Sequence, residues 1–100
     1  MALVTVARLS ALAPGRTAQV VARGAVLALF NVGGKVYATD GTCLHRGGPL
    51  GEGELDGSVV TCPLHGWTYE VTSGQSLVNP AARLRTYPVV VEGDEVKVDL

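Results

Sequence analysis

Four side chains of this chain are of the types that bind transition metals through sulfur or imidazole nitrogen, and they fall in two short segments. Cys43 and His45 lie in "CLHRGGPL", and Cys62 and His65 lie in "CPLHGW". The 100 residues contain no other Cys or His. Thiolate and imidazole groups can bind a metal, form a redox pair, or act as nucleophile and base. The repeated Cys-His pairing predicts that the two segments share one site.

The spacing is C-x-H, sixteen residues, then C-x-x-H. Two thiolates and two imidazoles would suit a tetrahedral structural zinc ion. Zinc sites, however, usually pair ligands of one kind within a segment, whereas each segment here mixes them. The mixture also allows both Cys to bind one iron and both His to bind another, as in a Rieske [2Fe-2S] centre. A catalytic Cys-His dyad would leave the second pair unexplained.

The elements that must position these pairs are short and β-rich. Segments of strand length, enriched in Val, Thr and Tyr, are separated by Gly- and Pro-containing turn signals such as Arg23-Gly24 and Gly33-Gly34. This spacing predicts an all-β fold, an antiparallel β-sandwich or barrel. The expected strands cover residues 3–9, 17–22, 25–32, 35–40, 58–62, 67–72, 85–92 and 95–100.

The segment 41–66 differs from this pattern because it is dense in Gly and Pro, which indicates loops that follow tight paths. The sequence "ELDGSVV" (54–60) predicts a hairpin inside it, so the two Cys-His pairs can meet in space. Outside it, only the stretch 9–13 could be helical, and Pro14 keeps it short.

Composition favours one folded domain over residues 1–100, since 47% of the residues are hydrophobic and 17% are charged. A formal net charge of −1 indicates neither a nucleic-acid-binding nor a polybasic membrane-binding surface. The first residues, "MALVTVARLSALAPG", resemble neither an export signal nor a membrane span. These features predict a cytoplasmic protein whose partners are small molecules or other proteins.

The residues quoted above resemble those of the Rieske-type iron-sulfur proteins, most closely the small soluble Rieske ferredoxins. The resemblance is specific over the segment 41–74 and looser across the rest of the chain. It implies a single Rieske domain whose two loops bind one [2Fe-2S] cluster. By the same resemblance, Cys43 and Cys62 would hold the buried iron, and His45 and His65 would hold the outer iron with their ring edges toward solvent.

The chain departs from the cytochrome-complex branch of this family. That branch has a further cysteine in each loop, joined as a disulfide, where this chain has Gly48 and Leu64. It also has a serine, which donates a hydrogen bond, where this chain has Trp67, whereas its tyrosine is retained as Tyr69. Fewer donors stabilise the reduced cluster less. The resemblance therefore implies a potential at the low end of the family window of roughly −150 to +300 mV.

The resemblance also implies roles for the residues around the cluster. Leu44, Leu50 and Leu64 would shield the cluster from water. Pro49 and Leu50 would form an apolar docking face beside the histidines. Tyr69 and Trp67 alternate along a strand, so they would face the same side, over the core. For Tyr69 the alternative is contact with a cluster sulfur.

The implied function is one-electron transfer rather than catalysis, because a cluster with all ligand positions filled offers no site for substrate. The partners would be an NAD(P)H-dependent flavoprotein reductase and a terminal Rieske dioxygenase acting on aromatic rings. Two alternatives remain open: a small Rieske-like subunit of an NAD(P)H nitrite reductase, and a zinc-stapled interaction module without a redox role.

Overall fold

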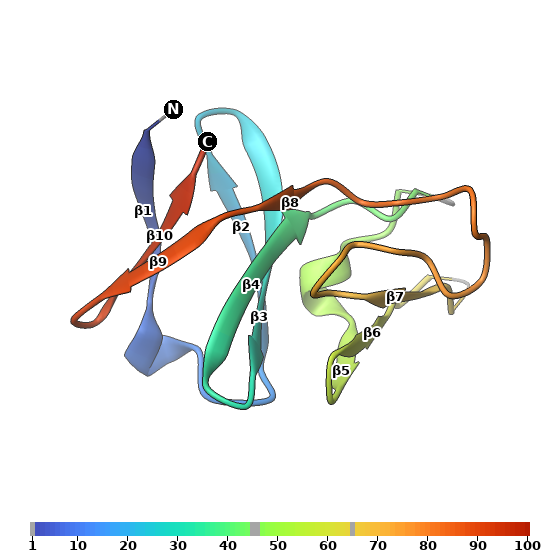
Figure 1. Cartoon of the computed structure of the whole chain (residues 1–100), viewed down its shortest axis with the longest axis horizontal. Helices are drawn as coiled ribbons and strands as arrows, with labels where there is room; N and C mark the ends of the chain where they lie inside the picture. The colour runs from blue at the N-terminus through green and yellow to red at the C-terminus, as the bar shows by residue number, and fades with distance from the viewer. Residues whose placement is uncertain (1, 45–46, 65) are drawn as a thin grey trace.

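The computed structural model describes residues 2–44, 47–64 and 66–100, which form three antiparallel sheets (Figure 1). The sheets have the strand orders β1-β10-β9, β2-β3-β4-β8 and β5-β6-β7. In chain order the strands are β1 (Leu3–Arg8), β2 (Thr17–Ala22), β3 (Ala25–Val32), β4 (Lys35–Asp40), β5 (Glu54–Asp56), β6 (Val59–Thr61), β7 (Thr68–Glu70), β8 (Thr86–Tyr87), β9 (Val89–Glu92) and β10 (Glu95–Asp99).

Strand β3 is apolar on both faces and lies between two cores. Leu27 and Leu29 point into a core shared with β10, where Val96 and Val98 are also buried. The alternate residues of β3 point into a second core, which contains both cysteines and Tyr69. Because successive side chains of a strand point to opposite faces, one strand supplies both cores. The sheet β2-β3-β4-β8 is thus the middle layer of the molecule.

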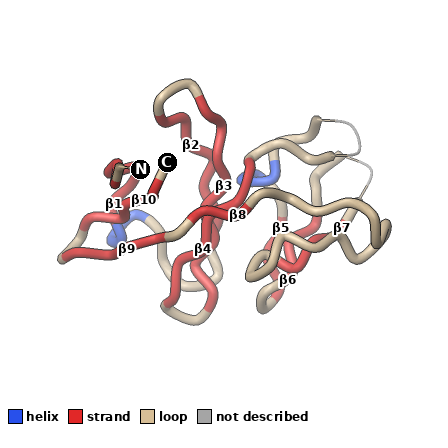
Figure 2. The backbone as a smooth tube through the Cα atoms, turned by 45° about the horizontal axis from the view of Figure 1, so that its top comes forward, coloured by secondary structure: helices blue, strands red, loops and turns tan. Residues whose placement is uncertain are grey.

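The three layers are visible in two orientations of the chain. Figure 2 shows the sheet β1-β10-β9 and both termini on one side of the middle sheet, and the sheet β5-β6-β7 on the other. The loops that carry the predicted ligands belong to the β5-β6-β7 side, at the end of the molecule farthest from the termini. The middle sheet is therefore the platform on which the ligand loops rest.

The prediction of an all-β antiparallel fold is confirmed, and three predicted strands, 17–22, 25–32 and 35–40, match β2, β3 and β4 in length. The predicted strand 85–92 is wrong as a single element. It is divided at Pro88 into β8, which pairs with β4, and β9, which pairs with β10. Proline lacks an N–H to donate to a ladder, and here it marks the point where the chain changes sheets.

The helical content is small. The stretch predicted as short and helical contains the 3-10 helix η1 (Leu9–Ala11). A second 3-10 helix, η2 (Leu50–Glu52), was not predicted and follows the first ligand loop. The predicted hairpin at 54–60 is present as β5 and β6. In the part of the chain that the structure describes, no helix has the length and apolarity needed to cross a membrane.

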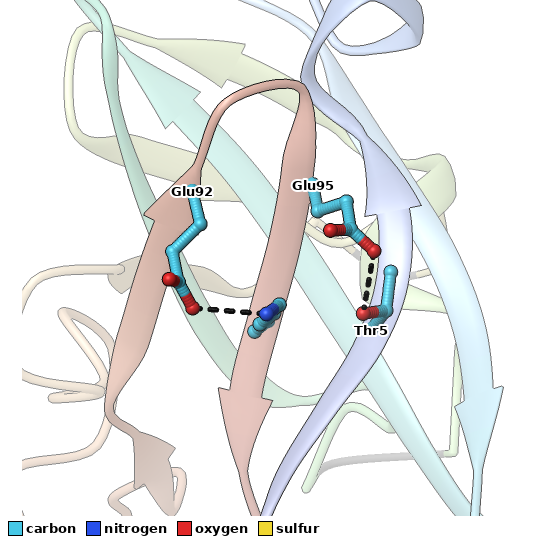
Figure 3. A network of polar contacts seen from close by, with 4 residues as sticks. Thr5, Glu92 and Glu95 are labelled. Carbon is cyan, nitrogen blue, oxygen red and sulfur yellow. Dashed lines mark hydrogen bonds and ion pairs between the residues drawn. The ribbon is translucent and has the colours of Figure 1, made fainter.

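The outward face of the sheet β1-β10-β9 carries polar side chains, unlike its inward face (Figure 3). The Thr5 hydroxyl donates to Glu95 across β1 and β10 at 3.3 Å. Lys97 Nζ lies 2.9 Å from Glu92 across β10 and β9. Such exposed cross-strand pairs contribute little stability. They identify this face as solvent-facing, away from the ligand loops.

Candidate functional site

The first ligand loop leaves β4 and returns to η2 as a tight hairpin. Thr42 and Pro49 form an isolated β-bridge, and the amide of Cys43 donates to the carbonyl of Gly48 at 2.8 Å. The amide of Gly47 donates back to the Cys43 carbonyl at 2.9 Å. These bonds turn the backbone so that the Cys43 side chain enters the core, where only 2% of the residue is exposed.

The second ligand loop connects β6 to β7. The Cys62 amide donates to the Trp67 carbonyl at 2.7 Å, which closes the loop one step beyond the ladder between the two strands. Cys62 is 2% exposed, whereas Leu64 is 47% exposed. The loop thus buries its cysteine and presents the following residues to solvent.

The two loops meet at their cysteines. Cys43 and Cys62 are buried in the same core cluster, and the two are not joined by a disulfide. A Cβ atom placed on Gly48 would lie 2.7 Å from Cys62 Sγ and 3.2 Å from the Leu64 Cβ. Glycine at position 48 is therefore needed for the first loop to approach the second. Gly48 and Leu64, which match the positions of the two disulfide cysteines in the cytochrome-complex branch, are therefore neighbours.

Tyr69 on β7 reaches the sulfur of the first loop. Its hydroxyl lies 3.3 Å from Cys43 Sγ and accepts a hydrogen bond from the Leu44 amide at 3.1 Å. When Cys43 is a thiolate it can only accept, so the Tyr69 proton is directed at the sulfur. Trp67 packs against the same core, with its ring 6.4 Å from that of Tyr69. The prediction that both aromatic residues pack over this core is confirmed.

Burial governs the ionisation of this site. Desolvation raises the pKa of the Cys62 thiol, and the neighbouring Cys43 raises it further, while the Leu64 amide acts in the opposite direction. Desolvation also raises the pKa of the Tyr69 hydroxyl, aided by the bond to Cys43. Two adjacent buried thiolates are therefore unfavourable without a cation to compensate them. Two sulfurs, a hydroxyl donor and a close backbone approach fit a metal-sulfur group bound at this place.

The structure brings the predicted ligands Cys43 and Cys62 together. The other two predicted ligands, His45 and His65, lie outside the described residues, as does Arg46. Leu44 and Leu64, which precede the two histidines, are 49% and 47% exposed, so the histidines are flanked by solvent-facing residues.

One prediction about the leucines is wrong. Leu50 cannot form a docking face, because it is fully buried in the second core beneath the loop. Leu44 and Leu64 each expose about half of their surface, and their shielding of the cluster stays a prediction. Loop leucines are placed by the path of the backbone, which apolar composition does not reveal.

Sequence reasoning also missed the contribution of β2 to the site. Gln19 forms hydrogen bonds with Gly41 and Gly51, the residues that begin and end the first ligand loop. The local signal for this contact is that these two glycines flank the loop, where glycine also fits a tight turn or a close approach of the main chain to a cluster.

The model of the Rieske [2Fe-2S] domain family matches residues 2–88. The ferredoxin component of the naphthalene 1,2-dioxygenase system of Pseudomonas aeruginosa is 40% identical over 82 residues, which cover 81% of this chain and 79% of that protein.

Two solved structures share the fold over nearly the whole chain. The ferredoxin-oxygenase complex of carbazole 1,9a-dioxygenase contains a chain with a TM-score of 0.88 and 37% identity, with 96% of this chain and 91% of that chain covered. A candidate small subunit of an NADPH nitrite reductase matches with a TM-score of 0.85 and 26% identity, over 100% of both chains.

Proposed function

Because the chain belongs to the Rieske [2Fe-2S] domain family, we propose that it carries single electrons from an NAD(P)H-dependent flavoprotein reductase to a terminal dioxygenase acting on aromatic rings. The main support is its similarity to the naphthalene dioxygenase ferredoxin, at 40% identity over most of both chains. In the carbazole 1,9a-dioxygenase structure, a ferredoxin is in complex with the oxygenase. In this proposal the chain is not itself an enzyme but an electron-transfer component.

We propose that Cys43 and Cys62 hold one iron of the cluster and that His45 and His65 hold the other. The adjacent buried sulfurs of the two loops support the first half of this assignment. The second half is supported by the mixed Cys-His spacing and by the exposed residues next to each histidine. Sulfur ligands inside the protein and imidazoles at its edge would let an electron enter and leave on the solvent side.

The described residues position and insulate this centre. A bound cluster supplies one-electron chemistry, since it alternates between two oxidation states without releasing a ligand. With Cys43 as a thiolate ligand, the Tyr69 hydroxyl would donate to its sulfur at 3.3 Å, and this hydrogen bond would be stronger when the sulfur carries more negative charge. The buried apolar side chains of the second core exclude water from the sulfur side. The fold thus stabilises added negative charge while keeping the sulfurs dry.

The docking face in this proposal is formed by Leu44 and Leu64, the exposed leucines of the two loops. Redox partners form small and transient complexes, commonly burying less than about 1,200 Å². Two half-exposed leucines beside the electron exit give such a complex apolar contact without a permanent interface.

We also propose that residues 1–100 act as one Rieske domain, with the cluster-binding segment, here called the ligand segment, at about 41–74. The second core supports this, because it joins Phe30 of the middle sheet to Val60 and Tyr69 of the ligand segment. Limited proteolysis of the holoprotein should leave one resistant fragment. Separation of the ligand segment from a stable remainder would contradict the proposal.

The function is tested by an anaerobic redox titration of the purified holoprotein followed by visible absorption. We expect a reversible one-electron bleaching at the low end of the window of roughly −150 to +300 mV. Stoichiometric zinc without visible absorption would instead support the structural zinc site. A cluster that exchanges electrons with a sirohaem nitrite reductase, and not with a dioxygenase, would support the second candidate.

The ligand assignment is tested by Cys43→Ser and His65→Cys, with Leu44→Ala and Leu64→Ala as neighbouring controls. Cys43→Ser should abolish iron binding, and His65→Cys should change or abolish the visible spectrum, because an imidazole ligand is replaced by a thiolate. The leucine variants should retain iron and spectrum but transfer electrons to the oxygenase more slowly. Full iron content in Cys43→Ser, or an unchanged spectrum in His65→Cys, would refute the assignment.

A further inference from the structure

The side chain of Gln19 on β2 bonds to both ends of the first ligand loop. Its Nε2 donates to the Gly41 carbonyl at 2.8 Å, and its Oε1 accepts from the Gly51 amide at 2.7 Å. Gly41 follows β4 and Gly51 lies within η2, so the two contacts span the loop that carries Cys43. One carboxamide therefore closes the base of the loop with both its donor and its acceptor.

The two glycines at these ends are required by the close approach of neighbouring strands, β2 at Gly51 and both β2 and β3 at Gly41. A Cβ atom on Gly41 would lie 2.9 Å from Gln19 Nε2 and equally close to the backbone of Leu27. A Cβ atom on Gly51 would lie 2.5 Å from both the amide nitrogen and the Oε1 of Gln19. Neither glycine has a left-handed φ angle, so conformational freedom does not explain them. Their role is to let the loop lie against Gln19.

Further hydrogen bonds hold the same two ends of the loop. Thr17, two residues before Gln19 on the same face of β2, donates through Oγ1 to the Gly51 carbonyl at 2.8 Å. The Gly41 carbonyl also accepts from the Leu50 amide at 3.0 Å. The Gly41 amide donates to the Val26 carbonyl of β3 at 2.9 Å. The loop is thus anchored to the middle sheet at its entry and its exit.

We propose that Gln19 is a positioning residue for the cluster, acting through the loop 41–51 to fix where Cys43 presents its sulfur. The proposal rests on the proposed function, in which Cys43 is an iron ligand. Hydrogen bonds outside the ligands orient the ligands and tune the metal they hold. A loop fixed at both ends moves less when the cluster gains an electron. Gln19 thereby restrains both cluster release and the change in geometry between the two oxidation states.

The test compares the holoprotein with Gln19→Met, which keeps the length of the side chain but removes both hydrogen bonds. The matched control is Val21→Ala, two residues along the same strand and 71% exposed. Hydrogen exchange by mass spectrometry reports on the loop 41–51, chelator-driven bleaching reports on cluster release, and a redox titration gives the midpoint potential. We expect exchange in the loop and cluster release to accelerate about tenfold in Gln19→Met, which corresponds to about 1.4 kcal/mol. We also expect a displaced midpoint potential, and no change in Val21→Ala.

Gln19→Glu separates the two halves of the contact. Its carboxylate still accepts from the Gly51 amide but cannot donate to the Gly41 carbonyl. Loop exchange should therefore be faster than in the wild type, because a carboxylate oxygen then faces the Gly41 carbonyl oxygen in place of a donor. If Gln19→Met does not fold, the proposal is tested with Gln19→Glu instead. A hydrogen-exchange rate in its loop 41–51 equal to that of the wild type would overturn the proposal.

Two further results would also overturn it. One is a Gln19→Met protein that behaves as Val21→Ala does in all three measurements. The other is a rise in exchange of equal size in the loop and in β10, since this would show a general loss of stability. Failure of the proposed function gives a different result. If the wild-type protein shows no reversible redox transition, the electron-carrier role is refuted, but the effect of Gln19→Met on hydrogen exchange in the loop can still be measured.

Discussion

The middle sheet and the ligand segment are built by different means. Strands β2, β3 and β4 have six to eight residues each and are continuously paired, and β3 is buried on both faces. Strands β5, β6 and β7 have three residues each. The rest of the ligand segment depends on single contacts, such as Gly48 against Cys62 and Tyr69 against Cys43. The middle sheet is stabilised by many backbone hydrogen bonds and buried side chains, whereas the geometry of the site depends on a few contacts between single residues.

This difference predicts that stability and cluster binding respond to different substitutions. Loss of an apolar side chain from the core between β3 and β10 should lower the free energy of unfolding and leave the cluster spectrum unchanged. Small changes in the ligand segment should alter the cluster more than they alter the stability of the fold. The following predictions test this separation, from the largest expected effect to the smallest.

Leu29→Ala should give the largest loss of stability. Leu29 is fully buried in the core that faces away from the cysteines, and its truncation leaves a cavity. The free energy of unfolding should fall by about 3–5 kcal/mol in denaturant titrations. The visible spectrum of the folded holoprotein should match that of the wild type. A shifted spectrum would show that the two faces of β3 are not independent.

Gly48→Ala should damage the site more than the fold. The added Cβ would lie 2.7 Å from Cys62 Sγ, so the loops must separate, at a cost of about 1–3 kcal/mol. Iron content per chain should fall. The control is Gly57→Ala at the β5-β6 turn, where φ is +61° and no atom lies within 4 Å. It should cost about 1–2 kcal/mol through backbone strain and retain full iron. Equal iron loss in both variants would contradict a specific role for Gly48.

Tyr69→Phe should lower the midpoint potential while preserving packing. The variant removes the hydroxyl that lies 3.3 Å from Cys43 Sγ. That donor favours the more negative reduced state, so its loss should cost the reduced protein about 1 kcal/mol, or about 40 mV for one electron. A redox titration measures the shift. Tyr87→Phe serves as the control, because Tyr87 packs against the other core and its hydroxyl donates to Asp40. A potential that rises or does not move would refute the donor role.

Glu70→Gln should have the smallest effect, and it should depend on pH. Bonds from Thr72 and Ser58 lower the pKa of the Glu70 carboxyl below its ordinary value. A lowered folded-state pKa contributes stability above the unfolded pKa of about 4.3, and this contribution is lost as the pH falls through the folded value. The difference between wild type and variant should be about 0.5 kcal/mol near neutral pH and should shrink as the pH falls below the unfolded pKa of about 4.3. Urea titrations over a series of pH values check this, and a pH-independent difference would contradict it.

The same two regions differ in how much of their structure has a local signal in the amino-acid sequence. Strands β2, β3 and β4 could be predicted to their end residues, because short apolar or alternating runs bounded by Gly turns give a local signal. The helix η2 and the burial of Leu50 could not, because they depend on how the first loop folds back onto β2 and the core. The break at Pro88 has a local signal, since Pro cannot donate to a ladder. Only the neighbouring sheets decide that the chain changes partners there.

The candidate chemistry of this protein can be read from its residue types alone. Two Cys-His pairs, with their spacing, are covalent facts of the chain, and thiolate and imidazole groups indicate potential metal ligands before their positions are known. The tertiary structure alone decided which groups surround the sulfurs. Tyr69 lies 26 residues from Cys43, and Gln19 lies 22 residues from Gly41, so neither contact has a local signal. Hydrogen bonds of this range form only when packing brings distant strands together.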